Sequence, residues 1–308
     1  MTIERFWAMP FWILSALAFG LQIDTLYRAM WRRRLPGLRG AILLTYRSVT
    51  LSLLFIVIPL IADRRASIML SAYGWFRRID DVVDGEGSLP KGQTILSYCQ
   101  QKKGIFTAVA FSSKYEGACA VEDLLLVHVL RASVCWNIDL RDEFATLLEL
   151  IQFDAKRRTQ ARATPATELR RYAIRQDVCF LSAFAKIFGR KQQLEQPVST
   201  IESLQGLFTR SDWLDDLPND MHNGMINIPA EVVQQGGGLE ELQNSTSFRK
   251  WHAKEIKELR RYWENVGHVF VRSYLNTYSS RLVARLMKKR VFETWEKACL
   301  EPAIRIKT

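Results

Sequence analysis

The feature that most constrains this chain is a run of three aspartates inside an apolar stretch of helix length. Asp80, Asp81 and Asp84 follow the aromatic-rich residues 73–76 and two arginines, and Gly85 ends the run. At a spacing of four residues, Asp80 and Asp84 lie on one helix face about one turn apart. Two like charges in this position repel, and a helix tolerates them best when a cation bridges them. Hard oxygen ligands of this kind suit Mg²⁺.

A second acidic stretch repeats this spacing far along the chain. Asp212, Asp216 and Asp220 recur every four residues, so a ladder of carboxylates runs along one helix face. Pro218 would bend or end a helix there. An isolated D-x-x-x-D pattern is usually a solvated acidic helix end. Two such helices facing each other can instead hold the Mg²⁺ that a diphosphate needs in order to leave as an anion, and the repetition favours this interpretation.

Composition narrows the choice of partner and metal. The 308 residues carry a formal net charge of +11, which suits a diphosphate substrate, anionic lipid headgroups or nucleic acid. No nucleic-acid module accompanies the charge, so we expect no nucleic-acid partner. The five cysteines and four histidines include no C-x-x-C or H-x-x-x-H pair, which argues against a zinc site. A hard cation bound by carboxylates remains the natural metal.

The hydrophobic pattern predicts an all-α protein. The region before the first motif shows no strand alternation of convincing length, and amphipathic segments of helix length recur after it. We expect one helical domain over residues 41–308, preceded by a separate segment, 1–40. The apolar stretch 41–62 is long enough to span a bilayer, but a buried core helix is the favoured interpretation. Further helices are expected at about 121–132, 142–153, 168–188, 251–278 and 282–299.

The N-terminal segment leaves three interpretations open. Residues 6–21 are apolar and rich in aromatic side chains, and the arginines at 32–34 follow them. Sixteen residues are fewer than the roughly 20 that a spanning helix needs. The first interpretation is a helix at the membrane interface, with arginines near anionic headgroups. The second is a helix packed on the protein body, and the third is a signal peptide or a true membrane span.

Both acidic stretches match motifs of a known family. The run Y-x-x-x-R-R-x-D-D-V-V-D-G at residues 73–85 and the run D-L-P-N-D-x-x-x-G-x-x-x-I-P at 216–229 resemble the two aspartate motifs of the squalene and phytoene synthase family. This family is the head-to-head branch of the all-helical isoprenoid synthases. The resemblance extends more weakly over residues 45–230, including Phe153, Asp154 and the helix of Tyr172, and it excludes the first forty residues.

The resemblance implies a single-domain helical bundle with a central apolar cavity, which couples two prenyl diphosphates through a cyclopropyl intermediate and releases diphosphate. Tyr73 would line the pocket and Tyr172 would lie near the reacting centre. Arg77 and Arg78 would contact the substrate diphosphate. The Mg²⁺ ligands would be Asp80, Asp81, Asp84, Asp212, Asp216 and Asp220. The resemblance implies a cytoplasmic enzyme, and peripheral contact with a membrane is the alternative that the N-terminal segment leaves open.

The sequence departs from the family pattern after Tyr172. Where the family has small residues, this chain has Gln176, Asp177, Val178 and Leu181, so we expect a narrower and more polar cavity. Gln176 and Asp177 either face solvent or line that cavity. Three functions stay open: head-to-head condensation, a terpene synthase that ionises and cyclises or hydrates a single substrate, and a non-catalytic relative. The sequence does not specify prenyl chain length, product, NADPH use or oligomeric state.

Overall fold

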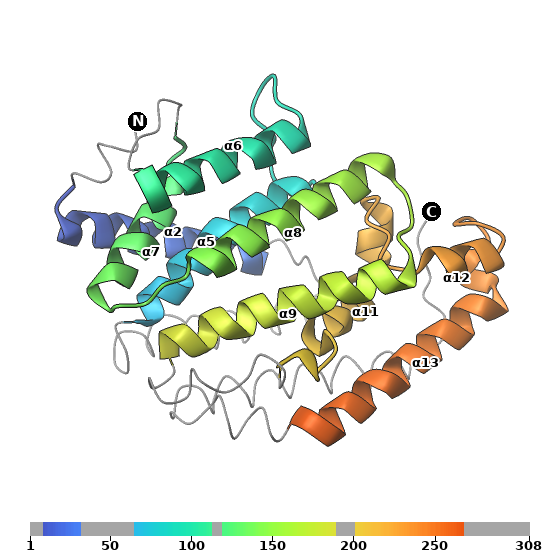
Figure 1. Cartoon of the computed structure of the whole chain (residues 1–308). Coiled ribbons are helices and arrows are strands. Elements are labelled where there is room, and N and C mark those ends of the chain that lie inside the picture. Colours follow the sequence, from blue (N-terminus) through green and yellow to red (C-terminus); the bar gives the residue numbers. More distant parts are fainter. Residues whose placement is uncertain (1–8, 32–64, 113–118, 189–200, 268–308) are drawn as a thin grey trace. The chain divides into compact units, whose positions relative to one another are not determined.

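The computed structural model describes residues 9–31, 65–112, 119–188 and 201–267, and every regular element in these ranges is a helix (Figure 1). The predicted all-α fold is confirmed. The predicted segments 41–62 and 282–299 lie outside the described residues. The α-helices are α2 (Phe11–Trp31), α5 (Ala66–Val83), α6 (Ile95–Thr107), α7 (Asp123–Cys135), α8 (Arg141–Gln160), α9 (Ala166–Phe188), α11 (Leu207–His222), α12 (Ala230–Gln235) and α13 (Thr246–Tyr262).

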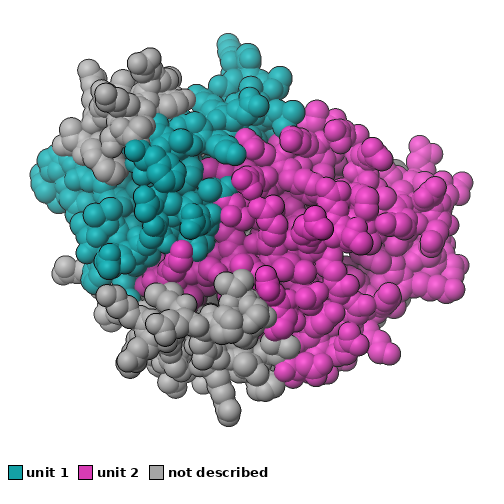
Figure 2. All heavy atoms as spheres, in the orientation of Figure 1, with its two compact units in different colours: residues 1–82, 87–145 teal, residues 83–86, 146–308 magenta. Residues whose placement is uncertain are grey.

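The chain divides into two compact units, coloured separately in Figure 2. Unit 1 comprises residues 1–82 and 87–145, and unit 2 comprises residues 83–86 and 146–308. The boundary between the units falls within the first acidic motif, between Val82 and Val83. Asp80 and Asp81 belong to unit 1, whereas Asp84 belongs to unit 2 together with α11. The predicted boundary near residue 40 stays a prediction.

The core of unit 1 is built on one face of α5. Ile68, Trp75 and Ile79 are completely buried, at a spacing that places them along one side of the helix. The indole of Trp75 stacks on Phe144 with ring centroids 6.2 Å apart, and Phe76 meets the same ring edge-on at 4.8 Å. This packing fixes the rotation of the helix that ends in the first acidic motif.

A buried ion pair also holds α5 in unit 1. The ammonium of Lys102 lies 2.7 Å from Asp123 Oδ1, and both side chains are almost completely buried. Trp75 Nε1 donates to the same carboxylate oxygen at 3.0 Å, while the backbone N–H of Ala120 donates to the other oxygen. Because both charges are paired and hydrogen-bonded, their burial is tolerated.

The N-terminal helix α2 belongs to unit 1 and packs one face on the other helices of that unit. Leu14 and Ala18 are completely buried, and Gln22 Nε2 donates to Ser71 Oγ of α5 at 2.7 Å. Ser71 Oγ in turn lies 2.9 Å from His128 Nδ1 of α7. This contact fits the interpretation of a helix packed on the protein body. Of the helices within the described residues, none has the length and apolar character needed to cross a membrane.

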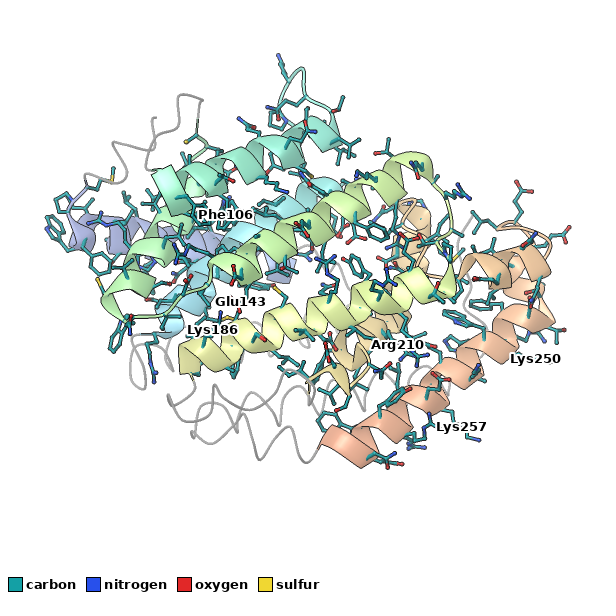
Figure 3. All side chains as sticks on the ribbon, viewed as in Figure 1. Phe106, Glu143, Lys186, Arg210, Lys250 and Lys257 are labelled. Carbon is teal, nitrogen blue, oxygen red and sulfur yellow. The ribbon has the colours of Figure 1, made fainter. Side chains whose placement is uncertain are left out.

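Unit 2 places α9 and α13 against α11, the helix of the second motif. Arg210 of α11 forms ion pairs with Glu255 and Glu258 of α13, at 2.5 and 3.2 Å. In Figure 3, Arg210 lies between the two helices, while Lys250 and Lys257 extend from α13 into solvent. The acidic side chains of α13 therefore pair with α11, and its lysines remain outside.

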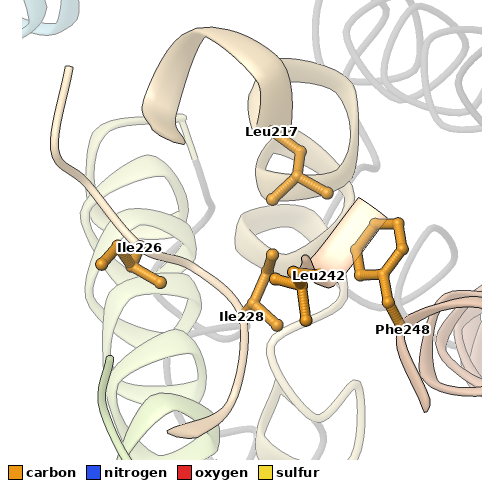
Figure 4. Close-up of a cluster of buried hydrophobic side chains, with 5 residues drawn as sticks. All are labelled: Leu217, Ile226, Ile228, Leu242 and Phe248. Atoms are coloured by element: carbon orange, nitrogen blue, oxygen red, sulfur yellow. The ribbon is translucent and has the colours of Figure 1, made fainter. Parts of the chain in front are cut away.

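An apolar cluster supports the end of the second motif. Its buried members come from α11, the loop after it, and the chain before and within α13 (Figure 4): Leu217, Ile226, Ile228, Leu242 and Phe248. Leu217 directly follows Asp216, so burial of its side chain orients this turn of α11. Burying a Leu or Ile side chain contributes about 1.5–3 kcal/mol, which makes the cluster a firm base for the motif.

Candidate functional site

The first acidic motif lies at the C-terminal end of α5. Asp80 and Asp81 are in the last turn, whereas the helix ends at Val83 and Asp84 follows it in a turn. Arg77 Nη1 lies 3.2 Å from Asp80 Oδ2, and Arg77 Nε lies 2.9 Å from Asp81 Oδ1. The arginine predicted to contact phosphate thus also neutralises carboxylates of its own helix.

The other two residues predicted on α5 have different surroundings. Arg78 forms an ion pair with Asp24 of α2, with Arg78 Nη2 and Asp24 Oδ2 2.5 Å apart. The resemblance did not reach α2, so the sequence offered no sign of this partner. The Tyr73 side chain is 39% exposed. Arg78 therefore joins α5 to the N-terminal helix, and its predicted contact with diphosphate stays a prediction.

The second acidic motif lies within α11. The helix continues through position 218 and ends at His222, so the proline does not end it. Asp212 is exposed, and Asp216 and Asp220 are half-buried. Asn227 Nδ2 donates to Asp220 Oδ2 at 2.7 Å, which orients that carboxylate from the loop after the helix.

Arg157 of α8 connects this loop to α8. The guanidinium is 5% exposed and donates to Asp154 Oδ1 at 2.9 Å and to Thr164 Oγ1 at 3.1 Å. One of its Nη atoms also donates to Ile226 O at 2.6 Å and to Asn227 Oδ1 at 2.8 Å. Charged hydrogen bonds of this kind are stronger than neutral ones. Arg157 therefore fixes the amide that holds Asp220.

Tyr172 of α9 joins the same network from the other end. Its hydroxyl donates to Asp154 Oδ2, and its ring lies between Phe153 and Trp213, with centroids 5.4 and 5.7 Å away. Burial raises the pKa of Asp154, while Arg157 and the tyrosine hydroxyl oppose that rise. Tyr172 and Asp220 were predicted separately as site residues. Hydrogen bonds now connect them by way of Asp154, Arg157 and Asn227.

The structure corrects the expectation for Asp177, which neither faces solvent nor lines a polar cavity. Its buried carboxylate accepts the backbone N–H groups of Phe208 and Thr209 at 2.9 and 3.0 Å, and the Thr209 hydroxyl at 2.7 Å. The first N–H groups of a helix have no partner within it, so Asp177 caps α11 from a neighbouring helix. Burial nevertheless raises the pKa of Asp177 to about 6, against the effect of these hydrogen bonds.

The remaining residues of that stretch are packed to different degrees. Leu181 is buried, Val178 is half-buried, and Gln176 Oε1 is buried and has no hydrogen-bond partner among the described residues. In place of small residues, α9 therefore presents larger side chains after Tyr172, and one of them supports the second acidic helix.

The acidic motifs offer the right type of donor for Mg²⁺. Among the described residues, no group of three or more His, Cys, Asp or Glu side chains is arranged to hold a metal ion. Mg²⁺ needs no such group, because it is usually bound by one or two carboxylates, with substrate phosphates and water completing its shell. As residue types, the aspartates of the two motifs suit this mode, and their assignment as Mg²⁺ ligands stays a prediction.

An apolar cavity of about 470 Å³ lies in unit 1, away from every predicted site residue. Its walls come from α2 and the segment before it, and from the start of α7 and the segment before that helix: Met9, Ala16, Leu17, Gly20, Leu21, Cys119, Val121 and Leu124. It is therefore distinct from the predicted central cavity, which stays a prediction.

Comparison with solved structures connects this fold to known enzymes. No family model matches the sequence, and no curated protein matches it either. The chain is similar to the squalene synthase HpnC from Alicyclobacillus acidocaldarius, with a TM-score of 0.60, 14% identity, and coverage of 92% of this chain and 97% of that one. It is equally similar to a dehydrosqualene synthase solved in complex with a ligand, at 0.60 and 14%, covering 92% and 88%. The fold is therefore that of the squalene synthase-like proteins.

Proposed function

We propose that this protein is a Mg²⁺-dependent isoprenoid synthase of the squalene and phytoene synthase family, which condenses two prenyl diphosphates head to head and releases diphosphate. The observation that carries the proposal is the hydrogen-bonded chain from Tyr172 to Asp220 in a fold similar to that of squalene synthases. It connects the tyrosine that the family motifs place near the reacting centre with an aspartate of the second motif.

The acidic motifs would hold the diphosphates. Asp80, Asp81 and Asp84 would serve one diphosphate, and Asp212, Asp216 and Asp220 the other. When bound, Mg²⁺ would neutralise the charge of the leaving diphosphate. Arg157 and Asn227 orient Asp220 before any ligand arrives, so this carboxylate needs little rearrangement.

The aromatic group around Tyr172 would protect the cationic substrate. Phe153 and Trp213 flank the tyrosine ring, and Tyr172 is 7% exposed. Aromatic faces attract cations, and a site without water prevents capture of the cation by hydrolysis. The Asp154 carboxylate holds the tyrosine hydroxyl in one orientation.

A single-substrate terpene synthase is the second candidate. It is favoured by the larger side chains after Tyr172, since Leu181 is buried where the family pattern has a small residue. With less room beside the tyrosine, the same scaffold would ionise one prenyl diphosphate and cyclise or hydrate it.

Product mass distinguishes these candidates. The purified protein is incubated with Mg²⁺ and either farnesyl or geranylgeranyl diphosphate, and the products are identified by mass spectrometry. A doubled carbon skeleton supports condensation, and an unchanged carbon count supports the second candidate. If no diphosphate is released with either substrate, the chain is not an enzyme of this class.

Two aspartate variants test the metal assignment. Asp84→Asn and Asp220→Asn keep the side-chain volume but remove the charge that binds Mg²⁺. Each should abolish turnover, whereas Glu240→Gln, at an exposed position of unit 2 outside the motifs, should leave it unchanged. Full activity of either aspartate variant would remove that residue from the proposed site.

A peripheral membrane contact is part of the proposal. One face of α2 exposes Trp12 and Phe19, with 73 and 38% of each side chain accessible. Exposed aromatic side chains on a helix are suited to the headgroup boundary. The double variant Trp12→Ser/Phe19→Ser should float less with anionic vesicles, whereas Trp136→Ser, at another exposed site, should not. Equal flotation of all three proteins would exclude α2 as the contact.

A further inference from the structure

The side chain of Arg158 connects the ends of the two acidic stretches. Its Nη1 atom donates to the backbone carbonyl of Val83, and its Nε atom donates to the carbonyl of Asn223 at 3.1 Å. Val83 is the last residue of α5, and Asn223 directly follows the last residue of α11. Asp84 is the next residue after the first carbonyl, and Asp220 lies three residues before the second. All of these residues belong to unit 2.

The turn after Asp84 is shaped to admit this guanidinium. Gly85 has a φ of +78°, which side chains other than glycine rarely adopt. A Cβ atom added to Gly85 would overlap the guanidinium group of Arg158. Gly92 has the same φ of +78°, but nothing lies within 4 Å of its added Cβ. Of these two glycines, therefore, Gly85 serves a close approach as well as a turn, and Gly92 serves a turn alone.

A guanidinium suits this position for two physical reasons. Its donors are fixed in one rigid plane, so two carbonyls bound to Nε and Nη1 are held at a fixed separation. The last carbonyls of a helix lack partners within it and carry partial negative charge, so a cation there is favourable. A lysine ammonium would supply the charge without the fixed spacing of two donors.

We propose that Arg158 is a positioning residue that sets the distance between Asp84 and Asp220 through their backbones. Arg158 touches no substrate in this role. It holds the backbones next to two carboxylates from distant parts of the sequence at a fixed separation, and so fixes the spacing of the two proposed diphosphate sites. The inference rests on the proposed function, because it assumes that these carboxylates bind diphosphate through Mg²⁺.

The first test compares two glycine variants. Gly85→Ala and Gly92→Ala introduce the same backbone strain, but only the first displaces Arg158. Binding of MgCl₂ with inorganic diphosphate is measured as the rise in thermal unfolding temperature over a range of ligand concentrations. Gly85→Ala should weaken binding about 10- to 100-fold, as loss of supporting contacts around metal ligands does. Gly92→Ala should bind as the unchanged protein does, and equal binding by both variants would overturn the proposal.

The second test replaces Arg158 itself. Arg158→Ala and Arg158→Lys are compared in the same titration, together with their urea-unfolding midpoints. If Arg158 only supplies charge, lysine restores binding; if it sets a spacing, lysine restores stability but leaves binding as weak as in Arg158→Ala. Restored binding in Arg158→Lys would refute the positioning role while leaving the proposed function intact. If the unchanged protein fails to bind Mg²⁺ with diphosphate, the proposed function and this inference both fail.

Discussion

The helices α5 and α11 both carry aspartates four residues apart, but the groups that hold these carboxylates come from different places. On α5, Arg77 of the same helix pairs with Asp80 and Asp81. On α11, Asp220 is held by Asn227 of the following loop, and Asn227 is held by Arg157 of α8. The first arrangement is local, with Arg77 and Asp80 partly exposed and Asp81 buried, whereas the second is tertiary, with Arg157 and Asn227 buried beside a half-buried Asp220.

This difference has a consequence for how each motif meets a ligand. A carboxylate paired with a flexible arginine on its own helix can exchange that partner for a metal at small cost, because exposed ion pairs contribute little. A carboxylate fixed by a buried network is oriented in advance, and disturbing its partners disturbs the fold. We therefore expect the first motif to be adjustable and the second to be rigid.

Removal of Arg157 should have the largest effect on this comparison. Arg157→Met leaves the largely buried Asp154 without its cation and removes the donors to Ile226 O and Asn227 Oδ1. Breaking a buried pair from one side costs about 3–5 kcal/mol in the free energy of unfolding. Urea unfolding measures the loss. The control is Arg175→Met, whose ion pair with Glu149 is about half-exposed and should cost less than about 1 kcal/mol. Similar losses in both variants would show that the second motif is not rigidly held.

Asn227→Ala should have the next largest effect. It removes the amide donor to the half-buried Asp220 and one acceptor of the buried Arg157, which costs about 1–3 kcal/mol. It should also weaken the binding of Mg²⁺ with diphosphate, because Asp220 loses its orientation. Both quantities are measured by urea unfolding and ligand-dependent thermal unfolding. Asn244→Ala, at an exposed position, is the matched control. Binding unchanged from the wild type would mean that Asn227 supports the fold alone.

Arg77→Gln should change stability less than Arg157→Met does, because the Arg77 and Asp80 side chains are 31 and 40% exposed and only Asp81, at 12%, is largely buried. Diphosphate affinity should nevertheless fall, since the proposed function gives Arg77 a phosphate contact. The variant is examined by the same two measurements as Asn227→Ala. A stability loss as large as that of Arg157→Met would contradict the contrast between a local and a tertiary motif.

The sequence was sufficient for the parts of this site that depend on local pattern. A helix was predicted at 168–188 and α9 is observed at Ala166–Phe188, because its apolar periodicity and the following glycine mark both ends. The two acidic stretches lie on or directly after helices, as their spacing predicted. Their assignment as metal ligands stays a prediction.

The supporting contacts could not be predicted, because their partners are far apart in the sequence. Arg157 and Asn227 are separated by 70 positions, and no local pattern signals their hydrogen bond. Asp177 was interpreted as a solvent-facing or cavity-lining residue, since a polar residue in an apolar helix usually has one of these two roles. Its actual partners are the first N–H groups of α11, about thirty positions away. The one available signal in the sequence was an acidic residue within an otherwise apolar helix.

The smallest expected effects concern pH, where the two helices again differ. His128 contacts Ser71 of α5, and burial lowers its pKa to about 4. The folded protein then binds fewer protons at His128 than the unfolded chain does, so this contribution is complete above pH 6.5 and is lost as the pH falls towards 4. Asp177 caps α11, and its pKa is raised to about 6. The folded protein binds more protons there, so its contribution is complete below about pH 4 and is lost as the pH rises through 6.

Urea-unfolding midpoints of His128→Gln and Asp177→Asn, measured from pH 4 to 7, separate these two effects. Relative to His128→Gln, the unchanged protein should gain stability as the pH rises through this range. Relative to Asp177→Asn, it should lose stability between pH 4 and 6. The opposite signs follow from one physical cause, since burial disfavours the charged form of both groups, and charging a histidine requires acid whereas charging an aspartate requires base. Parallel pH curves for either variant and the unchanged protein would show that the group in question does not titrate differently on folding. The anchoring of its helix would then be insensitive to pH.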